Sequence, residues 1–383
     1  MITKLLKKIA VKIEKKQNNI FTYPIDKQQK YINKFEDPKN NIERSYFQYC
    51  CQMKLYGKPI HLLLNIASLP LVIFYMIKLK SVKLEKNTKD AVFFNDGKPF
   101  NIIPNSILKK YKDIITISSN ERCLSKNDKR FLYKIFKKYP FSWLFWLKLI
   151  IKVSQYSYAI NKYSPKAIIC CSEFSFTSSI LTEYCHLKNI KLINVMHGEK
   201  LYNINDSFAK FDEFYVWGQE YIDLLCSLRF DKNQFKIEVP KSLRIKKNNF
   251  VKVKYDFTYY LGGETIDELV RISENLRVIK NNGFKVSIRP HPRYSDMSEI
   301  NKIFDFLDIE NLEKTTIETS LLQTKNAISL FSTVLTQAYY SSIGIGIIID
   351  DISVPNKYEK LEELKYIMIS VEHKLLSELI NKQ

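Results

Sequence analysis

The chain has 383 residues, a formal net charge of +20 and a hydrophobic content of 45%. This apolar fraction excludes a disordered chain, and the length exceeds what one ordinary core fills, so it predicts two domains. The excess of Lys and Arg favours anionic partners, namely nucleotides, nucleic acid or an acidic membrane surface.

The first sixteen residues, MITKLLKKIAVKIEKK, predict a basic amphipathic helix. Six lysines supply its charge, and one helical face is apolar: Ile2, Leu5, Leu6, Ile9, Ala10 and Ile13. Such a helix lies in the headgroup region of an anionic leaflet or packs on its own domain, and the pattern leaves both open. The first apolar run of any length comes well after the N-terminus, so we expect no signal peptide.

Two later apolar segments raise the same question of membrane contact. The segment LLLNIASLPLVIFYMI at 62–77 is shorter than the ~20 residues of a membrane span and contains Asn65, Ser68 and Pro70. We expect a buried helix there, or one that dips partly into a membrane, rather than a transmembrane helix. The aromatic run FSWLFWLKLIIKV at 141–153 predicts either an interfacial surface or part of the core.

Strand-like and helix-like segments alternate along most of the chain. The first series has a helix at 178–189 and strands at 91–94, 113–118, 166–172, 191–196 and 234–240. The second series has helices at 265–283 and 333–342 and strands at 257–263, 285–290, 325–332 and 343–350. This alternation predicts parallel sheets, and hence an α/β protein with two Rossmann-like, doubly wound domains.

The alternation breaks at 218–250, where Lys and Arg are frequent. We therefore expect an N-terminal domain over residues 1–220 and a C-terminal domain over residues 250–383. From fold analogy alone, the last segment, VEHKLLSELINKQ, is expected to form a helix that packs back on the N-terminal domain.

The seven cysteines include no CxxC pair. Cys170 and Cys171 follow the apolar run AII, which predicts that they are buried at a strand. The pattern indicates a reducing compartment, with no disulfide framework and no zinc site.

Two polar turns follow strands of the first series. The turn VMHGEK carries His197, Gly198 and Glu199, and either His197 or Glu199 can act as a general base or hold a substrate hydroxyl. The turn FNDGKP carries Asp96 before Gly97, a pair common in ordinary turns. The sequence therefore leaves His197, Glu199 and Asp96 as alternatives for a catalytic base.

A rigid histidine follows a strand of the second series, in KVSIRPHPRYSD at 285–296. Pro290 and Pro292 fix their φ angles and offer no N–H, so they hold His291 without competing for hydrogen bonds. Ligands of α/β sheets usually bind at such strand ends. We expect His291 to face an anion with at most one of its two flanking arginines, while the other arginine anchors the loop.

Two further strand ends are candidate phosphate sites. Ser332 and Thr333 stand where a strand gives way to a helix, and N–H groups at a helix N-terminus bind phosphate, although a cap without a ligand is the commoner case. Gly262 and Gly263 form a second, weaker candidate, because LGGE matches neither a GxGxxG nor a Walker loop. No DxD-like pair is well placed, so no metal site is predicted.

These motifs together resemble those of known enzymes. The pair His291-Pro292, followed by Ser332-Thr333, resembles the HP and S motifs of bacterial sialyltransferases with the GT-B fold. Similar HG and HP elements occur in transferases that use CMP-Kdo and CDP-glycerol to build capsules and teichoic acids. The resemblance covers short motifs, mostly in the C-terminal half, and the two-domain pattern.

The resemblance implies a GT-B arrangement in which two Rossmann-like domains face a cleft. It implies that His291 contacts the donor phosphate or acts as acid to the leaving nucleotide, and that Ser332 and Thr333 bind the same phosphate. The acidic D/E-D/E-G motif that supplies the base in sialyltransferases has no full copy here, although Asp96-Gly97 keeps part of it. The expected donor-binding residues are Gly262, Gly263, Arg289, His291, Pro292, Ser332 and Thr333.

The implied activity is that of a metal-independent glycosyltransferase without a cofactor. It would transfer a sugar, sialic acid in the first place, from a CMP-activated donor to a surface glycan such as lipooligosaccharide or capsule. We expect a cytoplasmic protein that is peripheral on the inner face of the cell membrane.

The alternatives are a Kdo or glycerol-phosphate transferase of the same architecture and, less favoured, a non-catalytic membrane-associated protein. Nucleic-acid binding is disfavoured, because the sequence has no helix-turn-helix, zinc knuckle or aromatic RNP pattern.

Overall fold

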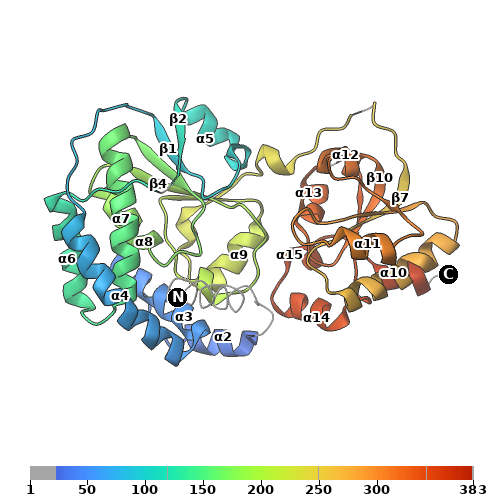
Figure 1. Ribbon diagram of the computed structural model, residues 1–383, viewed down its shortest axis with the longest axis horizontal. Coiled ribbons are helices and arrows are strands. Elements are labelled where there is room, and N and C mark those ends of the chain that lie inside the picture. The colour runs from blue at the N-terminus through green and yellow to red at the C-terminus, as the bar shows by residue number, and fades with distance from the viewer. Residues whose placement is uncertain (1–22, 119, 249, 342, 382–383) are drawn as a thin grey trace. The chain divides into compact units, whose positions relative to one another are not determined.

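The computed structural model describes residues 23–118, 120–248, 250–341 and 343–381, so the basic segment at 1–16 lies outside the described residues. The chain forms two compact units (Figure 1). The N-terminal unit contains the residues up to His197 together with Tyr202–Glu238, and the C-terminal unit contains Gly198–Leu201 and the residues from Val239 onward. The first domain was expected to end at residue 220. In the structure the N-terminal unit continues to Glu238, because strand β6 still belongs to its sheet.

Six parallel strands form the sheet of the N-terminal unit, in the order β2-β1-β3-β4-β5-β6. Their bounds are β1 Ala91–Phe94, β2 Ile114–Ile117, β3 Ala167–Cys170, β4 Lys191–Val195, β5 Glu213–Val216 and β6 Phe235–Ile237. Strand β5 was not predicted. The chain order reverses between β1 and β3, and ligands of doubly wound sheets bind at the carboxyl edge beside such a reversal.

Helices cover both faces of this sheet. On one face, Phe93, Ile169 and Ile193 pack with Ile107 of α5 (Asn105–Lys110). On the other face, Phe94 stacks on Tyr156 of α7, with ring centroids 4.8 Å apart. The remaining helices of the unit are α2 (Ile25–Ile32), α3 (Asn41–Tyr56), α4 (Lys58–Lys78), α6 (Lys126–Lys138), α7 (Trp143–Tyr163), α8 (Ser178–His186) and α9 (Gln219–Ser227).

The buried segments of the N-terminal unit agree in part with the sequence. Cys170 and Cys171 are buried, as predicted. Most of the run at 141–153 forms the beginning of α7 and contributes one face to the core, where Phe145, Leu149, Ile150 and Val153 are fully buried. Phe141, just before the helix, is exposed.

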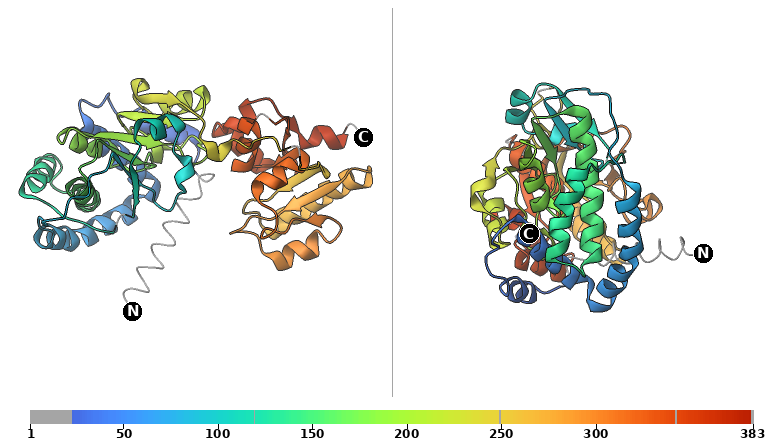
Figure 2. Two further views of the ribbon diagram at one scale, coloured as in Figure 1. Left: turned by 90° about the horizontal axis from the view of Figure 1, so that it is seen from above. Right: turned by 90° about the vertical axis from the view of Figure 1, so that its left-hand side faces the viewer.

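Helix α4 differs from its prediction. It has 21 residues and, by length and composition alone, is long and apolar enough to cross a membrane. It begins two residues after Tyr56, with Pro59 in its first turn, and continues through Pro70. Its outer face is exposed, so the expectation of a buried helix at 62–77 is wrong, while the alternative of a helix that dips partly into a membrane stays a prediction. Figure 2 shows α4, in blue, running beside α7, in green.

The C-terminal unit has a second parallel sheet of six strands, in the order β12-β11-β10-β7-β8-β9. Their bounds are β7 Tyr255–Tyr260, β8 Val286–Arg289, β9 Asp308–Ile309, β10 Thr324–Ser329, β11 Gly346–Ile349 and β12 Lys374–Leu375. This is the Rossmann strand order, with its reversal between β7 and β10.

One face of the second sheet packs on α10 (Ile266–Asn281), α11 (Met297–Ile303) and α16 (Leu376–Asn381). On the opposite face, the hydroxyl of Tyr260 lies 2.9 Å from that of Ser320 in α12 (Ile317–Leu322). Helix α13 (Thr333–Ser341) follows β10, and α14 (Pro355–Glu363) and α15 (Ile367–Ser370) follow β11.

The end of the chain packs on α10 of its own unit, because Leu376 belongs to that unit's core. The expectation that it packs back on the N-terminal domain is therefore wrong. The prediction of two doubly wound, Rossmann-like α/β domains is confirmed, and the cleft between them stays a prediction.

Candidate functional site

Three of the predicted donor-side segments lie together at the carboxyl edge of the C-terminal sheet. Gly262 and Gly263 follow β7, and β7 lies between β8, which leads to His291, and β10, which leads to Ser332. A Cβ added to Gly263 would lie 3.9 Å from Tyr294, and one added to Gly262 would lie 3.6 Å from the carbonyl oxygen of Phe331. The glycine turn therefore lies between the other two segments, at the reversal of strand order.

His291 is held in one orientation by its own loop. Its Nδ1 accepts the backbone N–H of Arg293 at 3.1 Å, and its backbone N–H donates to the Ser295 hydroxyl at 2.8 Å. Its ring stacks on Tyr294, with centroids 4.5 Å apart. Because Nδ1 accepts a hydrogen bond, the proton of the neutral ring is on Nε2.

The environment of His291 favours the neutral ring. Burial, and then the nearby Arg293 cation, lower the pKa of His291 below its ordinary value. Near pH 7 the ring is therefore neutral and offers Nε2–H as a hydrogen-bond donor. Pro292, also predicted on the donor side, is exposed in the same turn.

Arg289 anchors the loop. Its guanidinium donates to the Glu310 carboxylate at 2.6 Å and to the carbonyl oxygen of Thr315 at 3.0 Å. The side chains of Arg289 and Glu310 are only 11% and 5% exposed. The guanidinium predicted to bind the donor is thus committed to β9 and the segment after it, and the exposed Arg293 is the arginine available to a ligand.

The glycine turn already binds an anion from its own chain. The N–H of Gly262 donates to both carboxylate oxygens of Glu264, each at 2.8 Å. Burial raises the pKa of this carboxyl group. A hollow of about 120 Å³ lies beside the turn and is lined by Gly262, Glu264, Tyr294 and Ser295 among others. A phosphate that takes the Gly262 N–H must displace Glu264.

The N-terminus of α13 is the third part of this edge. The Ser332 hydroxyl accepts the N–H of Val334 at 3.2 Å and so caps the helix, while Thr333 is exposed beside it. One turn further, the Thr336 hydroxyl donates to the Glu199 carboxylate. Glu199, one of the candidate bases, therefore groups with the C-terminal unit.

The other two candidate bases lie at the carboxyl edge of the N-terminal sheet. Asp96 follows β1 and His197 follows β4, and β3 lies between these two strands. Asp96 is exposed in a turn and has a positive φ of 45°.

A buried carboxylate that the sequence analysis missed lies behind His197. Glu173 follows β3 and is fully buried, and its Oε1 lies 3.6 Å from Nδ1 of His197. Asn194 donates to the other carboxylate oxygen at 3.0 Å, and Gln48 donates to the backbone carbonyl of Glu173 at 3.0 Å. The distance to His197 is that of an ion pair rather than a hydrogen bond. Glu173 is therefore positioned to orient the imidazole and to stabilise its protonated form.

Lys148 of α7 is a second residue that the sequence analysis did not identify. Desolvation, and then the neighbouring Lys152 cation, lower its pKa, while the charge of Asp96 opposes this shift. Its Nζ lies 6.0 Å from the ring centroid of Phe176. Nothing in the local sequence distinguishes it from the many other lysines.

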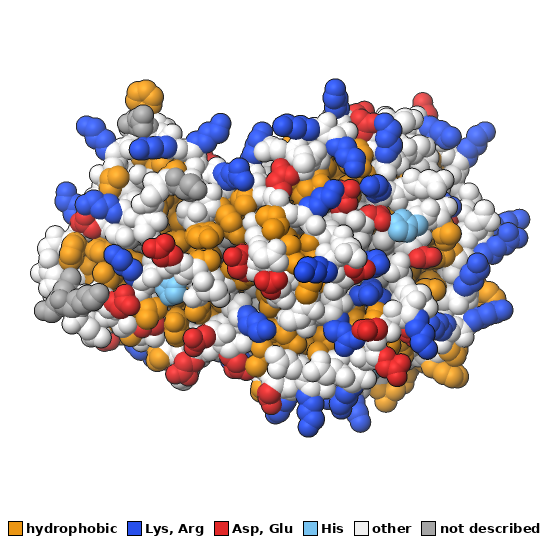
Figure 3. All heavy atoms as spheres, turned by 180° about the vertical axis from the view of Figure 1, so that it is seen from behind, with side chains coloured by type: hydrophobic (Ala, Val, Ile, Leu, Met, Phe, Trp, Pro, Cys, Tyr) orange, Lys and Arg blue, Asp and Glu red, His pale blue; other side chains and the backbone are white. Residues whose placement is uncertain are grey.

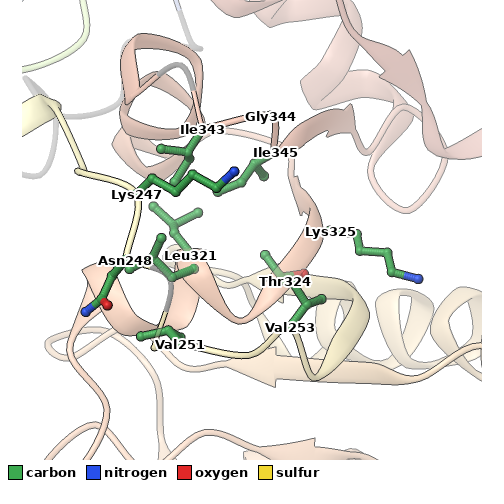
Figure 4. Close-up of a pocket in the computed structure, with 11 residues that line it drawn as sticks. Lys247, Asn248, Val251, Val253, Leu321, Thr324, Lys325, Ile343, Gly344 and Ile345 are labelled. Carbon is green, nitrogen blue, oxygen red and sulfur yellow. The ribbon is translucent and has the colours of Figure 1, made fainter.

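A separate hollow of about 560 Å³ lies at the opposite, amino-terminal edge of the C-terminal sheet (Figure 4). Its lining is mostly apolar, with Lys247 and Lys325 among its polar members. Lys325 is paired with Asp256 at 2.8 Å. None of the predicted site residues lines this hollow. Within the described ranges, no group of three or more His, Cys, Asp or Glu side chains gathers to hold a metal ion.

No family model and no curated protein matches the chain. Its structure is similar to UDP-GlcNAc 2-epimerase of Methanocaldococcus jannaschii, with 14% identity, a TM-score of 0.43, and coverage of 78% of this chain and 91% of that one. It is similar to the wall teichoic acid polymerase TagF, with 10% identity, a TM-score of 0.40, and coverage of 85% and 89%. It is also similar to an α/β-galactoside α-2,3-sialyltransferase of Photobacterium phosphoreum, with 15% identity, a TM-score of 0.41, and coverage of 77% and 100%.

At these identities and TM-scores the function has to be inferred from the chain's own residues, because one fold hosts many activities.

Proposed function

We propose that the protein is a glycosyltransferase that binds a nucleotide-activated sugar at the carboxyl edge of its C-terminal sheet. The observation that carries this proposal is the fixed orientation of His291. Its Nδ1 is bonded to the Arg293 N–H, which leaves the Nε2–H as the donor of a rigid, half-buried ring. This edge also holds a helix N-terminus and the exposed Arg293.

Transfer of the sugar breaks the bond between its anomeric carbon and a phosphate oxygen of the donor. Negative charge develops on that oxygen as the bond breaks. His291 stabilises it by hydrogen bonding or proton donation, and Ser332, Thr333 and the N-terminal N–H groups of α13 bind the same phosphate. These groups and Arg293 supply the positive charge, so no step of the proposal is assigned to a metal ion.

The acceptor side of the proposal rests on His197 and Glu173. The acceptor hydroxyl attacks the anomeric carbon and loses its proton to Nε2 of His197, while Glu173, near Nδ1, stabilises the imidazolium that forms.

Variants of the acceptor side distinguish the three candidate bases. His197→Ala is expected to lower kcat by about 10²–10³-fold, the effect of losing a general base. Glu173→Gln is expected to lower kcat by about ten-fold with little change in donor KM, and to move the acid limb of the kcat/KM profile to lower pH. The comparison variants are Asp96→Asn and Glu199→Gln. If one of these loses the acid limb while His197→Ala keeps it, the assignment of His197 is wrong.

The donor that we favour is CMP-sialic acid, with a surface glycan such as lipooligosaccharide or capsule as the acceptor. CMP-Kdo and CDP-glycerol are the alternatives, because the same phosphate contacts serve all three. Incubation with each donor in turn, with CMP release followed over time, identifies the substrate. Release from none of them, in the presence of capsule or lipooligosaccharide acceptors, contradicts the proposal.

The face seen in Figure 3 shows no sign of a nucleic-acid binding surface. On the face seen in Figure 3, Lys and Arg side chains are scattered among acidic and apolar ones rather than gathered in one stripe. Nucleic-acid binding proteins usually concentrate their positive charge on one face or helix. We place the enzyme in the cytoplasm, peripheral on the inner face of the cell membrane, where acceptors of surface polysaccharides are assembled.

A further inference from the structure

The outer face of α4 is apolar from end to end. Its exposed large side chains are Leu62, Leu63, Ile66, Leu71, Ile73, Phe74 and Ile77, and we call them the α4 face. They recur at helical spacing, and no charged residue interrupts them between Lys58 and Lys78. A helix of a soluble domain normally turns polar side chains toward water, so a continuous apolar face of this length indicates an interaction surface.

The inner face of α4 is fastened to the rest of the domain. Asn65 donates to the carbonyl oxygen of Phe141 at 2.8 Å and accepts the N–H of Leu144 at 3.0 Å. Near the other end, Lys129 donates to the carbonyl oxygen of Met76 at 2.6 Å. Val72, between these ends, is buried. If α4 crossed a bilayer, these contacts would break, so the helix stays along the domain and exposes one side only.

A neighbouring aromatic residue extends the apolar surface. The Asn65 bond holds the backbone of Phe141 beside the Ile66 turn, and the Phe141 side chain is 77% exposed. Aromatic rings are favoured at the boundary between headgroups and acyl chains. Phe141 thus adds an exposed apolar side chain beside the α4 face.

The charges around α4 fit an anionic surface. Between Glu43 and Glu85 the chain has no acidic residue, and it has Lys54 and Lys58 at one end of the helix and Lys78, Lys80 and Lys83 at the other. Amphipathic helices that lie in the membrane plane combine an apolar face with flanking cations that attract anionic lipids. An anionic bilayer presents hydrocarbon beneath a layer of negative charge, which matches this combination.

We propose that the α4 face docks in the plane of an anionic phospholipid bilayer, with its apolar side chains at the boundary of headgroups and acyl chains. The helix then lies parallel to the membrane as a one-sided anchor of the N-terminal domain. This proposal does not depend on the reaction that the protein catalyses.

Vesicle binding tests the proposal directly. The full chain is mixed with vesicles of phosphatidylcholine and phosphatidylglycerol and sedimented at low and at high salt. The variant Leu62→Ser, Ile66→Ser, Phe74→Ser is expected to reduce the membrane partition coefficient by about ten-fold or more, because it removes three apolar anchors. The control variant Leu187→Ser, Ile237→Ser, Val253→Ser changes side chains of similar exposure elsewhere and is expected to bind as wild type. Wild-type binding by the α4 variant would overturn the proposal.

A second measurement covers the case in which the triple variant does not fold. In Phe74→Trp the new indole is expected to shift its emission to the blue on vesicle addition and to be quenched by lipids brominated at shallow acyl positions. No change in emission would contradict docking. A different outcome is that the wild type forms a dimer and does not bind vesicles, with the triple variant monomeric. In that outcome the α4 face binds a second copy of the chain, and the proposal is wrong.

Deletion of residues 1–16 separates the two basic elements. We expect the deletion to remove the salt-sensitive part of vesicle binding, because six lysines are lost, and to leave the salt-resistant part that α4 supplies. Loss of all vesicle binding in this deletion, with the fold intact by circular dichroism, would contradict the role of α4.

Discussion

Replacing His291 with Ala is expected to lower kcat by about 10²–10⁴-fold, the usual range for a positioned acid. The nucleotide Kd is expected to rise much less, because the contact of Nε2–H with the phosphate strengthens as the leaving group gains charge. Single-turnover kinetics with the donor identified by CMP release, together with calorimetric titration of CMP, measure both quantities.

A matched variant separates two roles of His291. His291→Gln keeps an N–H donor near the position of Nε2 but cannot give up a proton. If the ring acts as a neutral hydrogen-bond donor, Gln recovers part of the rate that Ala loses, whereas a proton donor is not replaced by Gln. A fully active His291→Ala enzyme would show that this histidine is only a strand-end residue, and the proposed function would fall with it.

Replacing Glu310 with Ala is expected to lower the free energy of unfolding of the C-terminal domain by about 3–5 kcal/mol, the cost of breaking a buried ion pair. The change leaves the guanidinium of Arg289 buried without its carboxylate partner. Within the described part of the chain, its remaining hydrogen bond is the one to the carbonyl oxygen of Thr315. The loss is large because a buried cation without a counter-ion can be rehydrated only by local opening of the structure. Urea unfolding followed by circular dichroism measures it.

Two control variants test whether the loss of stability comes from the buried ion pair. Glu299→Ala breaks the exposed pair with Lys302 and is expected to cost about 0–1 kcal/mol. The double variant Arg289→Met, Glu310→Leu is expected to recover most of the stability, because it removes both charges together. An equal loss for Glu310→Ala and Glu299→Ala would show that the Arg289 pair does not stabilise β8 and β9.

The fold was predictable where the apolar pattern is strong. The strands predicted at 91–94 and 166–172 contain the continuous apolar runs AVFF and AIICC, as expected of parallel strands buried on both faces. Strand β5 was not predicted because it begins at a charged residue, Glu213, whose carboxylate is buried beside the ammonium groups of Lys110, Lys191 and Lys236. This cluster of one carboxylate and three ammonium groups forms only in the folded state, so no local sequence pattern predicts it.

Helix α4 was misjudged for a different reason. Pro70, Ser68 and Asn65 interrupt the apolar run, and residues of these three types normally weaken a long helix. In the structure Asn65 and Ser68 bond to backbone carbonyl oxygens on the inner side, so neither disrupts the helix. The bond from Asn65 to Phe141 is a tertiary contact, and such contacts override local preference.

The candidate site was predictable in its parts but not in its partners. His291, Ser332 and the glycine turn were identified because each follows a strand, and parallel strands end at one edge. Glu310 lies 21 positions after Arg289, and Glu173 and His197 follow two different strands, β3 and β4. These pairings depend on strand order, which the sequence pattern does not specify.

The contact between Glu264 and Gly262 has a consequence for turnover. In the proposed enzyme the carboxylate of Glu264 competes with the phosphate for the N–H of Gly262. It is tethered there, because Glu264 is only two residues further along the chain. A tethered competitor weakens every phosphate ligand by the same factor, substrate and spent nucleotide alike. When the product begins to dissociate, the Glu264 carboxylate binds the N–H of Gly262 again, which shortens the residence time of the product. The proposed enzyme would thus bind its donor less tightly and release the spent nucleotide faster.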